Sequence, residues 1–484
     1  MAVAAALRVL YVTPEVAPWV KTGGLGEVAQ GLPPALAGAG AQLRVLVPAY
    51  PALRAAFPQA RVLAEFRSPG GALPPARLLE APGVPPLWLL ECPSLFERAG
   101  NPYQTAQRDD WPDNHLRFGL LSRIAALLGS EASPLDWRPD VVHCNDWQSG
   151  LAPAYLAHAP GARAATVMTI HNLAYQGLFA ADSLAPLALP ASAFVPDGLE
   201  FFGKLSFLKA GVHYSSLVTT VSPGYAREIQ TPELGFGLDG LLRARAADLV
   251  GILNGIDTEL WDPARDPLIA QRYDAEWLER KAPNKTALQG AFGLPQTAGA
   301  PLLGMASRLV PQKGADLVLA VADDLVRAGA QLAILGTGER EIESALVALA
   351  ARHPRHIAAR IAFDEALAHL IEAGADIFLM PSRFEPCGLN QLYSMRYGTP
   401  PVVRRTGGLA DSVSERTGFL FDEATPQALR GAVSGALEAW RKPGAWRARQ
   451  RAGMRRDFGW GVPARAYLAA YRRALEVESE RRGT

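Results

Sequence analysis

The sequence predicts an α/β protein with two parallel sheets, each covered by helices on both faces. Short strand-like runs alternate with Ala- and Leu-rich helix-like segments along nearly all of the 484 residues. Several of these runs are continuously apolar, as buried parallel strands are. The alternation pauses at residues 254–283, which are rich in Asp, Pro and Trp. The pause predicts a border between two domains.

The predicted strands fall into two groups, one on each side of this border. The first group covers residues 7–12, 44–48, 141–144, 166–170 and 217–221. The second group covers residues 303–306, 332–335, 377–380 and 401–403. Residues 314–327 and 339–350 are typical of the intervening helices. The Pro- and Gly-rich residues 69–93 predict a hairpin or loop excursion from the first domain.

The last part of the chain predicts a single helix over residues 462–482. One face of this helix would present Tyr467, Leu468, Tyr471 and Leu475. We therefore expect an N-terminal Rossmann-like domain over residues 1–253 and a C-terminal one over residues 254–458. Residues 459–484 would form the final helical segment.

Composition narrows the class of protein. With 49% hydrophobic and 20% charged residues, the chain is expected to fold. The formal net charge of +1 argues against a general nucleic-acid binder. Three widely spaced cysteines, Cys92, Cys144 and Cys387, argue against a disulfide framework and a standard zinc module. They favour a reducing, cytoplasmic compartment.

The N-terminus and the hydropathy predict neither a signal peptide nor a membrane span. Residues 1–6 are apolar, but no basic region precedes them and they lead straight into a predicted strand. No run of about 18 apolar residues occurs anywhere in the chain.

A glycine-rich loop over residues 21–27, Lys-Thr-Gly-Gly-Leu-Gly-Glu, follows the first strand and opens a helix. Its amides could approach an anion closely, and Lys21 would add a mobile positive charge. The alternative is a flexible loop without a ligand. Residues 24–29 also match G-x-G-x-x-A, but the ten residues 13–22 lie between the strand and the first glycine, and no acid follows the second strand. A dehydrogenase is therefore disfavoured.

Two cations, Arg308 and Lys313, follow the predicted strand at residues 303–306. Open α/β sheets bind ligands at the carboxyl ends of their strands, and two cations there suit a diphosphate. A solvated loop with two surface cations is the alternative.

The segment over residues 381–398 carries the most information. A strand ends near Pro381, and a helix is expected to start near Gly388, so the amides of Gly388 and Leu389 would point at an anion. Glu385 precedes that helix and could accept sugar hydroxyls; a helix cap is the alternative. Thr406 begins a second amide-rich turn.

Polar residues also follow two strands of the first domain. Asp146 and His171 each come after an apolar run, and the imidazole of His171 could donate a hydrogen bond to a sugar or leaving-group oxygen. Satisfied buried polar groups are the alternative. A metal site that includes His143 is disfavoured, because no H-x-x-x-H, H-E-x-x-H or D-x-D pattern is present.

Taken together, these segments resemble the bacterial glycogen synthase and plant starch synthase family. The similarity follows chain order through residues 21–28, 143–147, 171–177, 211–222, 254–257, 307–314, 381–393 and 404–411. The resemblance implies the GT-B fold, which has two doubly wound Rossmann-like domains with a cleft between them. It also implies that the last helix returns to the first domain.

The resemblance further implies a retaining glucosyltransferase. Glucose would pass from a nucleotide sugar, usually ADP-glucose in bacteria, to the non-reducing end of an α-1,4-glucan such as glycogen. No metal or other cofactor would be required, and neither nucleic acid nor a membrane would be a partner.

Roles follow by position from the same resemblance. Arg308 and Lys313 would hold the diphosphate, while Lys21 and the Gly24 amide would reach its distal phosphate. Gly388 and Leu389 would contribute their backbone amides, as would the turn at Thr406. Glu385 and His171 would contact the glucosyl group, with Asp146 and Asn254 nearby. Phe363 would stack on the adenine.

Three positions depart from the family pattern. Glu27 stands where the family has Asp, Gln148 replaces a His and Asn390 replaces a Thr. Two other functions stay open: a non-catalytic glucan-binding relative, and a different nucleotide-sugar enzyme of the same fold, such as an epimerase or a sucrose- or trehalose-forming transferase.

Overall fold

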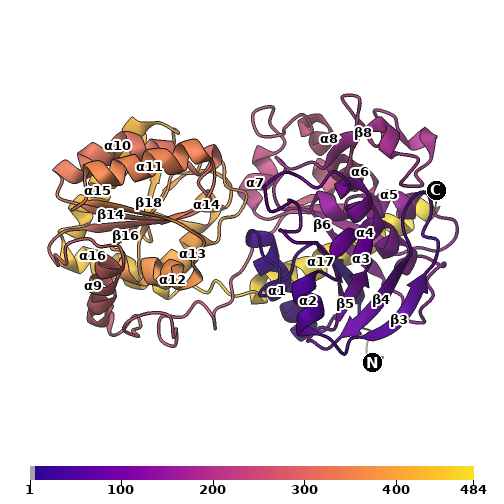
Figure 1. The fold of residues 1–484 in the computed structure, drawn as a ribbon, viewed down its shortest axis with the longest axis horizontal. Helices are drawn as coiled ribbons and strands as arrows, with labels where there is room; N and C mark the ends of the chain where they lie inside the picture. Colours follow the sequence, from indigo (N-terminus) through magenta and orange to yellow (C-terminus); the bar gives the residue numbers. More distant parts are fainter. Residues whose placement is uncertain (1–5, 484) are drawn as a thin grey trace. The chain divides into compact units, whose positions relative to one another are not determined.

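The computed structural model describes residues 6–483, which form two compact units (Figure 1). The first unit runs to Gly255 and resumes at Trp460, and the second covers Ile256–Gly459. The borders between the units along the chain therefore lie between residues 255 and 256 and between residues 459 and 460. The sequence predicted these borders between residues 253 and 254 and between residues 458 and 459. The expectation about a signal peptide concerns residues 1–6, of which 1–5 lie outside the described part.

The first unit is built on a nine-stranded sheet with the order β12-β11-β7-β6-β1-β2-β5-β4-β3. All neighbours from β12 to β5 pair in parallel, and β4 and β3 extend the sheet antiparallel. Its strands are β1 (Arg8–Val12), β2 (Gln42–Pro48), β3 (Arg61–Phe66), β4 (Ala76–Ala81), β5 (Leu87–Glu91), β6 (Val141–Asn145), β7 (Ala165–Ile170), β11 (Leu217–Thr220) and β12 (Leu249–Gly251).

Of the hairpin or loop excursion predicted at residues 69–93, the hairpin is confirmed, but its place as an excursion from the domain is wrong. This region includes a hairpin, β4 and β5, but β5 pairs in parallel with β2 inside the main sheet. All five residues of β5 are buried, which explains why this run belongs to the core despite the prolines and glycines around it.

Helices cover both faces of this sheet. The main ones are α1 (Gly24–Gly38), α4 (Asn114–Leu128), α5 (Leu151–Ala157), α6 (Phe207–Tyr214), α7 (Pro223–Glu228) and α8 (Asp239–Ala244), with shorter helices α2 (Pro51–Ala56) and α3 (Pro93–Phe96). A small separate sheet joins β8 (Leu178–Ala180), β10 (Lys204–Ser206) and β9 (Glu200–Phe201).

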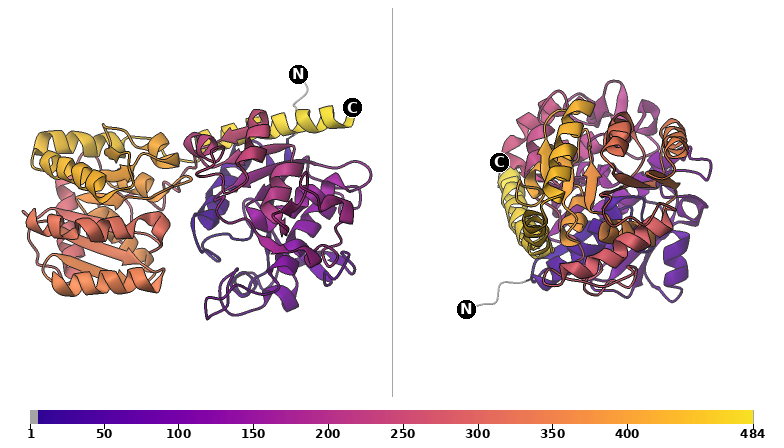
Figure 2. Two further views of the ribbon diagram at one scale, coloured as in Figure 1. Left: turned by 90° about the horizontal axis from the view of Figure 1, so that it is seen from above. Right: turned by 90° about the vertical axis from the view of Figure 1, so that its left-hand side faces the viewer.

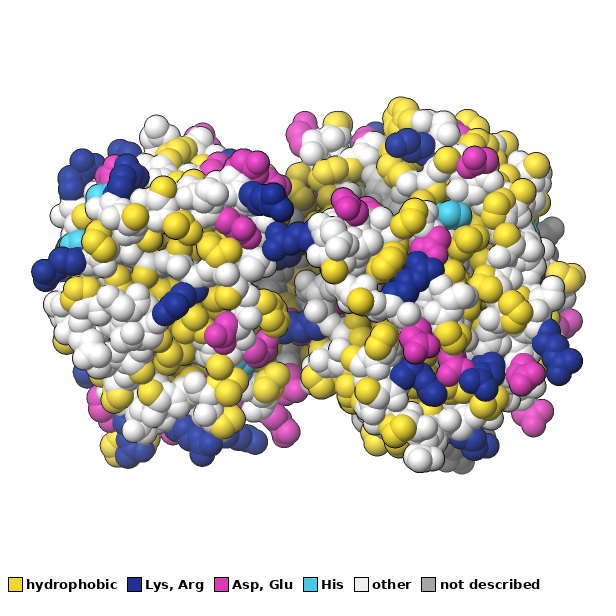
Figure 3. Space-filling view, viewed as in Figure 1, with side chains coloured by type: hydrophobic (Ala, Val, Ile, Leu, Met, Phe, Trp, Pro, Cys, Tyr) yellow, Lys and Arg dark blue, Asp and Glu magenta, His cyan; other side chains and the backbone are white. Residues whose placement is uncertain are grey.

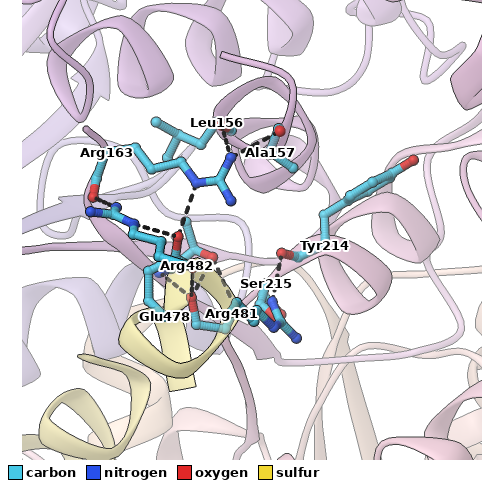
Figure 4. Close-up of polar contacts among 10 residues, drawn as sticks. Leu156, Ala157, Arg163, Tyr214, Ser215, Glu478, Arg481 and Arg482 are labelled. Carbon is cyan, nitrogen blue, oxygen red and sulfur yellow. Dashed lines mark hydrogen bonds and ion pairs between the residues drawn. The ribbon is translucent and has the colours of Figure 1, made fainter. Parts of the chain in front are cut away.

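The final helix, α17 (Gly461–Gly483), packs on the first unit, along β6, β7, β11 and α1 (Figure 2). Tyr467 and Tyr471 from its predicted apolar face are fully buried. Near its end, the buried Glu478 accepts hydrogen bonds from Arg163 at 2.9 Å and from Ser216 at 3.0 Å. Arg481 and Arg482 donate to backbone carbonyls of the same unit (Figure 4).

The second unit has a six-stranded, fully parallel sheet with the order β15-β14-β13-β16-β17-β18. Helices α10, α11 and α15 cover one face, and α9, α12 and α13 cover the other (Figure 1). The elements are α9 (Ala282–Ala291), β13 (Leu302–Ala306), α10 (Ala315–Arg327), β14 (Gln331–Gly336), α11 (Arg340–Arg352), β15 (Ile357–Ile361), α12 (Glu365–Gly374), β16 (Ile377–Met380), α13 (Asn390–Arg396), β17 (Pro401–Arg404), α14 (Gly407–Ser412), β18 (Phe419–Phe421), α15 (Pro426–Trp440) and α16 (Pro443–Met454).

The strand orders locate the ligand-binding edge of each sheet. In the first unit β1 lies between β2 and β6, and in the second β13 lies between β14 and β16, so the chain reverses its direction across the sheet at β1 and at β13. Open α/β sheets bind ligands outside the carboxyl ends of the strands at such switch points. The predicted site residues follow β1, β6 and β7 in one unit, and β13, β16 and β17 in the other.

The surface carries charges of both signs. On the face shown in Figure 3, basic and acidic side chains are interspersed over each unit, in keeping with the near-neutral net charge. Within residues 6–483, none of the helices combines the length and the apolar character that crossing a membrane would need.

Candidate active site

The glycine loop of the first unit lies between β1 and α1, as predicted. Lys21 forms an ion pair with Glu27, with 2.7 Å between Nζ and Oε1, and both side chains are about one-fifth exposed. Helix α1 begins at Gly24, so the amide of Gly24 belongs to the first turn, where backbone N–H groups have no partner inside the helix. A cation and a helix amide without a partner inside its own helix therefore occur together in the segment after β1.

The glycine loop is held in place by the side chain of Glu15, which is 2% exposed. Its Oε2 accepts the Thr22 amide at 2.7 Å and its Oε1 accepts the Thr22 hydroxyl at 2.5 Å. The hydroxyl of Tyr103 donates to the same Oε1. Burial raises the pKa of the Glu15 carboxyl, although the bonds from Thr22 and Tyr103 oppose the shift.

Asp146 and His171 lie side by side at the ends of β6 and β7. Asp146 has a left-handed backbone with φ of 54°, which is uncommon outside glycine and indicates a locally strained turn. Its Oδ1 accepts the amide of His171 at 2.7 Å. Burial raises the pKa of Asp146 to about 7, because little water reaches the carboxylate and the charge of Glu15 opposes ionisation, although the His171 and Asn172 amides stabilise the charged form.

The hydrogen bonds of His171 correct one sequence prediction. Its Nε2 lies 2.9 Å from Oδ1 of Asn145, and the Asn145 amide nitrogen donates to the carbonyl of Val12 at 3.0 Å. The oxygen of Asn145 therefore faces the ring, and Nε2 of His171 is the donor. Burial lowers the pKa of His171 to about 3, so the ring is neutral near pH 7. The remaining Nδ1 is an acceptor, where the sequence predicted a donor toward the sugar.

Asn254 and Phe363 occupy contrasting environments. Asn254 lies one residue before the border between the two units and is 6% exposed, and its buried Oδ1 has no hydrogen-bond partner among the described residues. Because a buried polar atom without a partner is costly, this oxygen is suited to receive a ligand donor. Phe363 precedes α12 in the second unit, and its ring is 76% exposed.

Arg308 and Lys313 follow β13 in the second unit. Arg308 is exposed, with 3.4 Å between its Nη2 and the side-chain oxygen of Gln312. Lys313 ends a short turn before Gly314, which has φ of +71° and would place a Cβ 2.2 Å from the carbonyl oxygen of Pro381. Only glycine fits there, so the loop after β13 packs against the end of β16.

That packing brings Lys313 to Glu385. The distance between Nζ of Lys313 and Oε2 of Glu385 is 2.5 Å, and the same oxygen accepts the hydroxyl of Ser382 at 2.9 Å. The Glu385 side chain is 7% exposed. Helix α13 has no side-chain cap, so the alternative role of Glu385 as a helix cap is wrong.

The helix after Glu385 starts later than predicted. Helix α13 begins at Asn390, with Leu389 as its N-cap residue, and Gly388 lies before it in a left-handed conformation with φ of +71°. The cause is a side-chain network: Gln391 donates to the carbonyls of Cys387 and Gly388 at 3.1 and 3.0 Å, which turns the chain before the helix. Gly388 and Leu389 are half-buried at the edge of the unit.

Thr406 and Asn390 frame this edge. Thr406 is 2% exposed and is the N-cap residue of α14, and the amide of Gly408 donates to the carbonyl of Glu385 at 3.0 Å. Asn390, one of the family departures, donates from its side chain to the carbonyl of Ala306 at 2.6 Å. The ends of β13, β16 and β17 are therefore joined around Glu385.

Sequence reasoning missed the residues that hold these groups in place. These are Glu15, Tyr103, Asn145 and Ser382. Glu15, Asn145 and Ser382 occur within three residues of a strand's carboxyl end, which was the available signal. Tyr103 lies in a loop with no such marker. Among residues 6–483, no group of three or more His, Cys, Asp or Glu side chains has the arrangement of a metal site.

Comparisons with known proteins agree with this arrangement. The starch synthase catalytic domain family matches residues 8–244, and the glycosyl transferases group 1 family matches residues 292–452. The glycogen synthase of Dechloromonas aromatica is 54% identical, covering 98% of this chain and 99% of that protein. That of Aromatoleum aromaticum is 53% identical, with 97% of each covered.

Solved structures extend the comparison. The catalytic domain of starch synthase IV from Arabidopsis thaliana, bound to ADP and acarbose, has a TM-score of 0.85 and 31% identity, covering 97% of this chain and all of that one. Sucrose-phosphate synthase from Thermosynechococcus elongatus has a TM-score of 0.61 at 17% identity, which concerns the fold alone, and covers 97% of this chain and 99% of that one. The predicted GT-B fold with two Rossmann-like domains is confirmed.

Proposed function

Because the chain belongs to the glycogen and starch synthase family of glycosyltransferases, we propose that it transfers glucose from ADP-glucose to the non-reducing end of an α-1,4-glucan with retention of configuration. The observation that supports this most directly is the Lys313–Glu385 pair at the carboxyl ends of β13 and β16. The pair places a cation that can bind phosphate next to a carboxylate that can accept hydrogen bonds from sugar hydroxyls. A nucleotide sugar presents both of these groups.

In this proposal the second unit binds most of the donor. Arg308 and Lys313 hold the diphosphate; the Lys313 ammonium has three donors, so it can keep its bond to Glu385 while it contacts phosphate. The edge formed by Gly388, Leu389 and Thr406 supplies further donors, and the exposed ring of Phe363 stacks on adenine. Oε1 of Glu385 accepts glucosyl hydroxyls.

The first unit offers its own groups to the substrates in this proposal. Lys21 and the Gly24 amide contact the distal phosphate. Nδ1 of His171 accepts a glucosyl hydroxyl, a role that its neutral ring and its Asn145 partner make possible. Asp146 orients His171 through the backbone amide, and the unpaired Oδ1 of Asn254 accepts a ligand donor.

The reaction breaks the bond between the glucosyl anomeric carbon and the diphosphate oxygen. An acceptor hydroxyl forms the new glycosidic bond on the same face, and its proton passes to the departing phosphate oxygen. Negative charge grows on the diphosphate, and fixed cations and amides stabilise it without reorganisation. The proposal needs no metal ion and no covalent sugar–enzyme intermediate.

We also propose that the reaction takes place in the cytoplasm, with no nucleic-acid partner. Cys92, Cys144 and Cys387 are buried and free, as thiols are in a reducing compartment. The substrates in this proposal are a nucleotide sugar and a glucan.

A donor panel with a glycogen primer tests the proposed function. Labelled ADP-glucose and UDP-glucose are each supplied with glycogen, and the linkage of the incorporated glucose is determined. We expect α-1,4-linked label from ADP-glucose. Incorporation from UDP-glucose alone would overturn the donor assignment, and no incorporation from either donor by folded protein would support a non-catalytic relative.

A further inference from the structure

We propose that Glu15 is a positioning residue for the donor phosphates, because its buried carboxyl group holds the loop that carries Lys21 and the Gly24 amide. The inference rests on the proposed function, which assigns Lys21 and Gly24 to the distal phosphate. Glu15 itself is buried beneath the loop and acts through Thr22.

The first argument is the position of the bonds. Both oxygens of Glu15 bind Thr22, one through the backbone amide at 2.7 Å and the other through the hydroxyl at 2.5 Å. Thr22 lies between Lys21 and the glycines, so these two bonds fix the backbone that carries the cation and the Gly24 amide. A two-point attachment sets orientation as well as distance.

The second argument is that the same carboxyl joins three segments. Tyr103, from the loop before α4, donates to Oε1 of Glu15. A Cβ at Gly26 would lie 3.4 Å from Oε2 of Glu15 and 3.1 Å from the carbonyl oxygen of Val20, so the first turn of α1 packs directly on this group. The amide of Ala17 also donates to the carbonyl of Gly26 at 3.1 Å. The loop is therefore held at both ends.

The third argument is a division of tasks between two carboxylates. Lys21 already has Glu27 as its ionic partner at 2.7 Å, so Glu15 is not needed to neutralise it. A buried carboxyl is costly, and well-packed apolar residues replace buried ionic groups at no loss of stability in many proteins. The orientation that Glu15 imposes on the phosphate loop, through Thr22 on one side and Tyr103 on the other, accounts for a carboxyl at this buried position.

Glu15 also influences a second group of site residues, Asp146 and His171, through its charge. Its charge contributes to the raised pKa of Asp146, whose Oδ1 holds the amide of His171. The glycine loop and the Asp146–His171 pair are thus electrostatically connected through Glu15.

The test is a double-mutant cycle between Glu15→Gln and Lys21→Ala, with kcat/KM for ADP-glucose as the readout. Since a displacement of about 1 Å costs up to about 100-fold, we expect Glu15→Gln to lower kcat/KM by roughly 10- to 100-fold, mostly in kcat. In the Lys21→Ala background the same substitution should cost at most about threefold, because the Lys21 cation is gone and only the Gly24 amide is left to be positioned.

Controls separate positioning from folding. Glu91→Gln removes another buried carboxyl of the same unit, one that pairs with Arg54 and Arg77, and should leave kcat/KM unchanged even if stability falls. Thr22→Val keeps the amide bond to Glu15 and removes the hydroxyl bond, so it should show a smaller loss in the same parameter and serves if Glu15→Gln does not fold.

The outcomes are distinct. An equal loss from Glu15→Gln in the wild-type and Lys21→Ala backgrounds, or a kcat/KM within about twofold of wild type for folded Glu15→Gln and Thr22→Val, overturns the positioning role. Wild-type kcat/KM in Lys21→Ala overturns instead the assignment of Lys21 in the proposed function, whatever Glu15→Gln does.

Discussion

The two units solve the same problem, holding a lysine beside a carboxylate, in different ways. In the second unit Lys313 pairs with Glu385 across two adjacent strand ends, with side chains 17% and 7% exposed. In the first unit Lys21 pairs with Glu27 on the next helix, at about 20% exposure for each. In the second unit one carboxylate, Glu385, pairs with the lysine and is also the proposed acceptor of sugar hydroxyls. In the first unit Glu27 pairs with the lysine, and the buried Glu15 holds the loop that carries it.

The largest expected effect tests the more buried pair. Lys313→Ala should lower kcat/KM for ADP-glucose by roughly 10²–10³, the cost of losing one donor to a developing anion. It also leaves Glu385 buried without its cation. Steady-state kinetics with a glycogen primer measure the loss, and Lys204→Ala, on the exposed end of β10, is the matched control. Unchanged activity in Lys313→Ala would show that the more buried lysine–carboxylate pair is not needed for transfer.

The next effect is a pH dependence that belongs to the first unit. Asp146 has a folded-state pKa of about 7 against 3.8, so the stability it provides is complete below about pH 4 and is lost as pH rises toward 7. Asp146→Asn should remove this loss, of about 1 kcal/mol per pH unit in that window. Urea unfolding from pH 4 to 8 measures the slope; identical slopes in the two proteins would show that Asp146 ionises normally.

A group of the second unit titrates in the opposite sense. Lys281 is buried among the carbonyls of Glu372 and Ala373 and the hydroxyl of Thr399, and burial lowers its pKa to about 7 from 10.5. Its stabilising contribution is therefore present above about pH 10 and is lost as pH falls toward 7.

Lys281→Met should flatten this loss, which we expect to be below about 1 kcal/mol per pH unit. Unfolding at several pH values between 7 and 10, with Lys285→Met as the control, provides the measurement. If the free energy of unfolding of Lys281→Met depended on pH as steeply as that of the wild type, Lys281 would not be the group that titrates in this range.

The smallest expected effect concerns the more exposed pair. Glu27→Gln should change kcat/KM by less than about tenfold, because a partly exposed ion pair contributes less than a buried one and Glu15 still holds the loop. Glu385→Gln, measured beside it, should cost at least ten times more. A loss in Glu27→Gln that equals the loss in Glu385→Gln would show that the two lysines depend equally on their partners.

Much of the fold could be predicted because buried parallel strands are nearly continuous apolar runs. The run at residues 377–380 matches β16 at both ends, and the run at 332–335 lies one residue inside β14 on each side. The first sheet was predicted less completely, since β3 is only partly buried and Pro- and Gly-rich connections surround β4 and β5. Periodicity carries little information in such segments.

The sequence indicated the charged residues of the candidate site but not the residues that hold them in place. Lys21, Arg308, Lys313 and Glu385 follow strands and carry charge, so the sequence indicates them. The donor and acceptor atoms of His171 depend on the orientation of the Asn145 amide, which is set by a bond to the carbonyl of Val12. The start of α13 depends on Gln391 binding back to Cys387. Such contacts between side chains and backbone have no fixed spacing in sequence.

The placement of α17 has a consequence for how the protein is made. The first unit is interrupted at Gly255 and finished only by Trp460 and the residues after it, with the whole second unit synthesised in between. Until the ribosome has released α17, His143 lacks the hydroxyl of Tyr471 that binds its Nδ1 at 2.8 Å, and Arg163 lacks Glu478. During synthesis the sheet of the first unit therefore lacks the helix that covers it. The second unit is continuous in sequence, so all of its residues are synthesised before the first unit is complete.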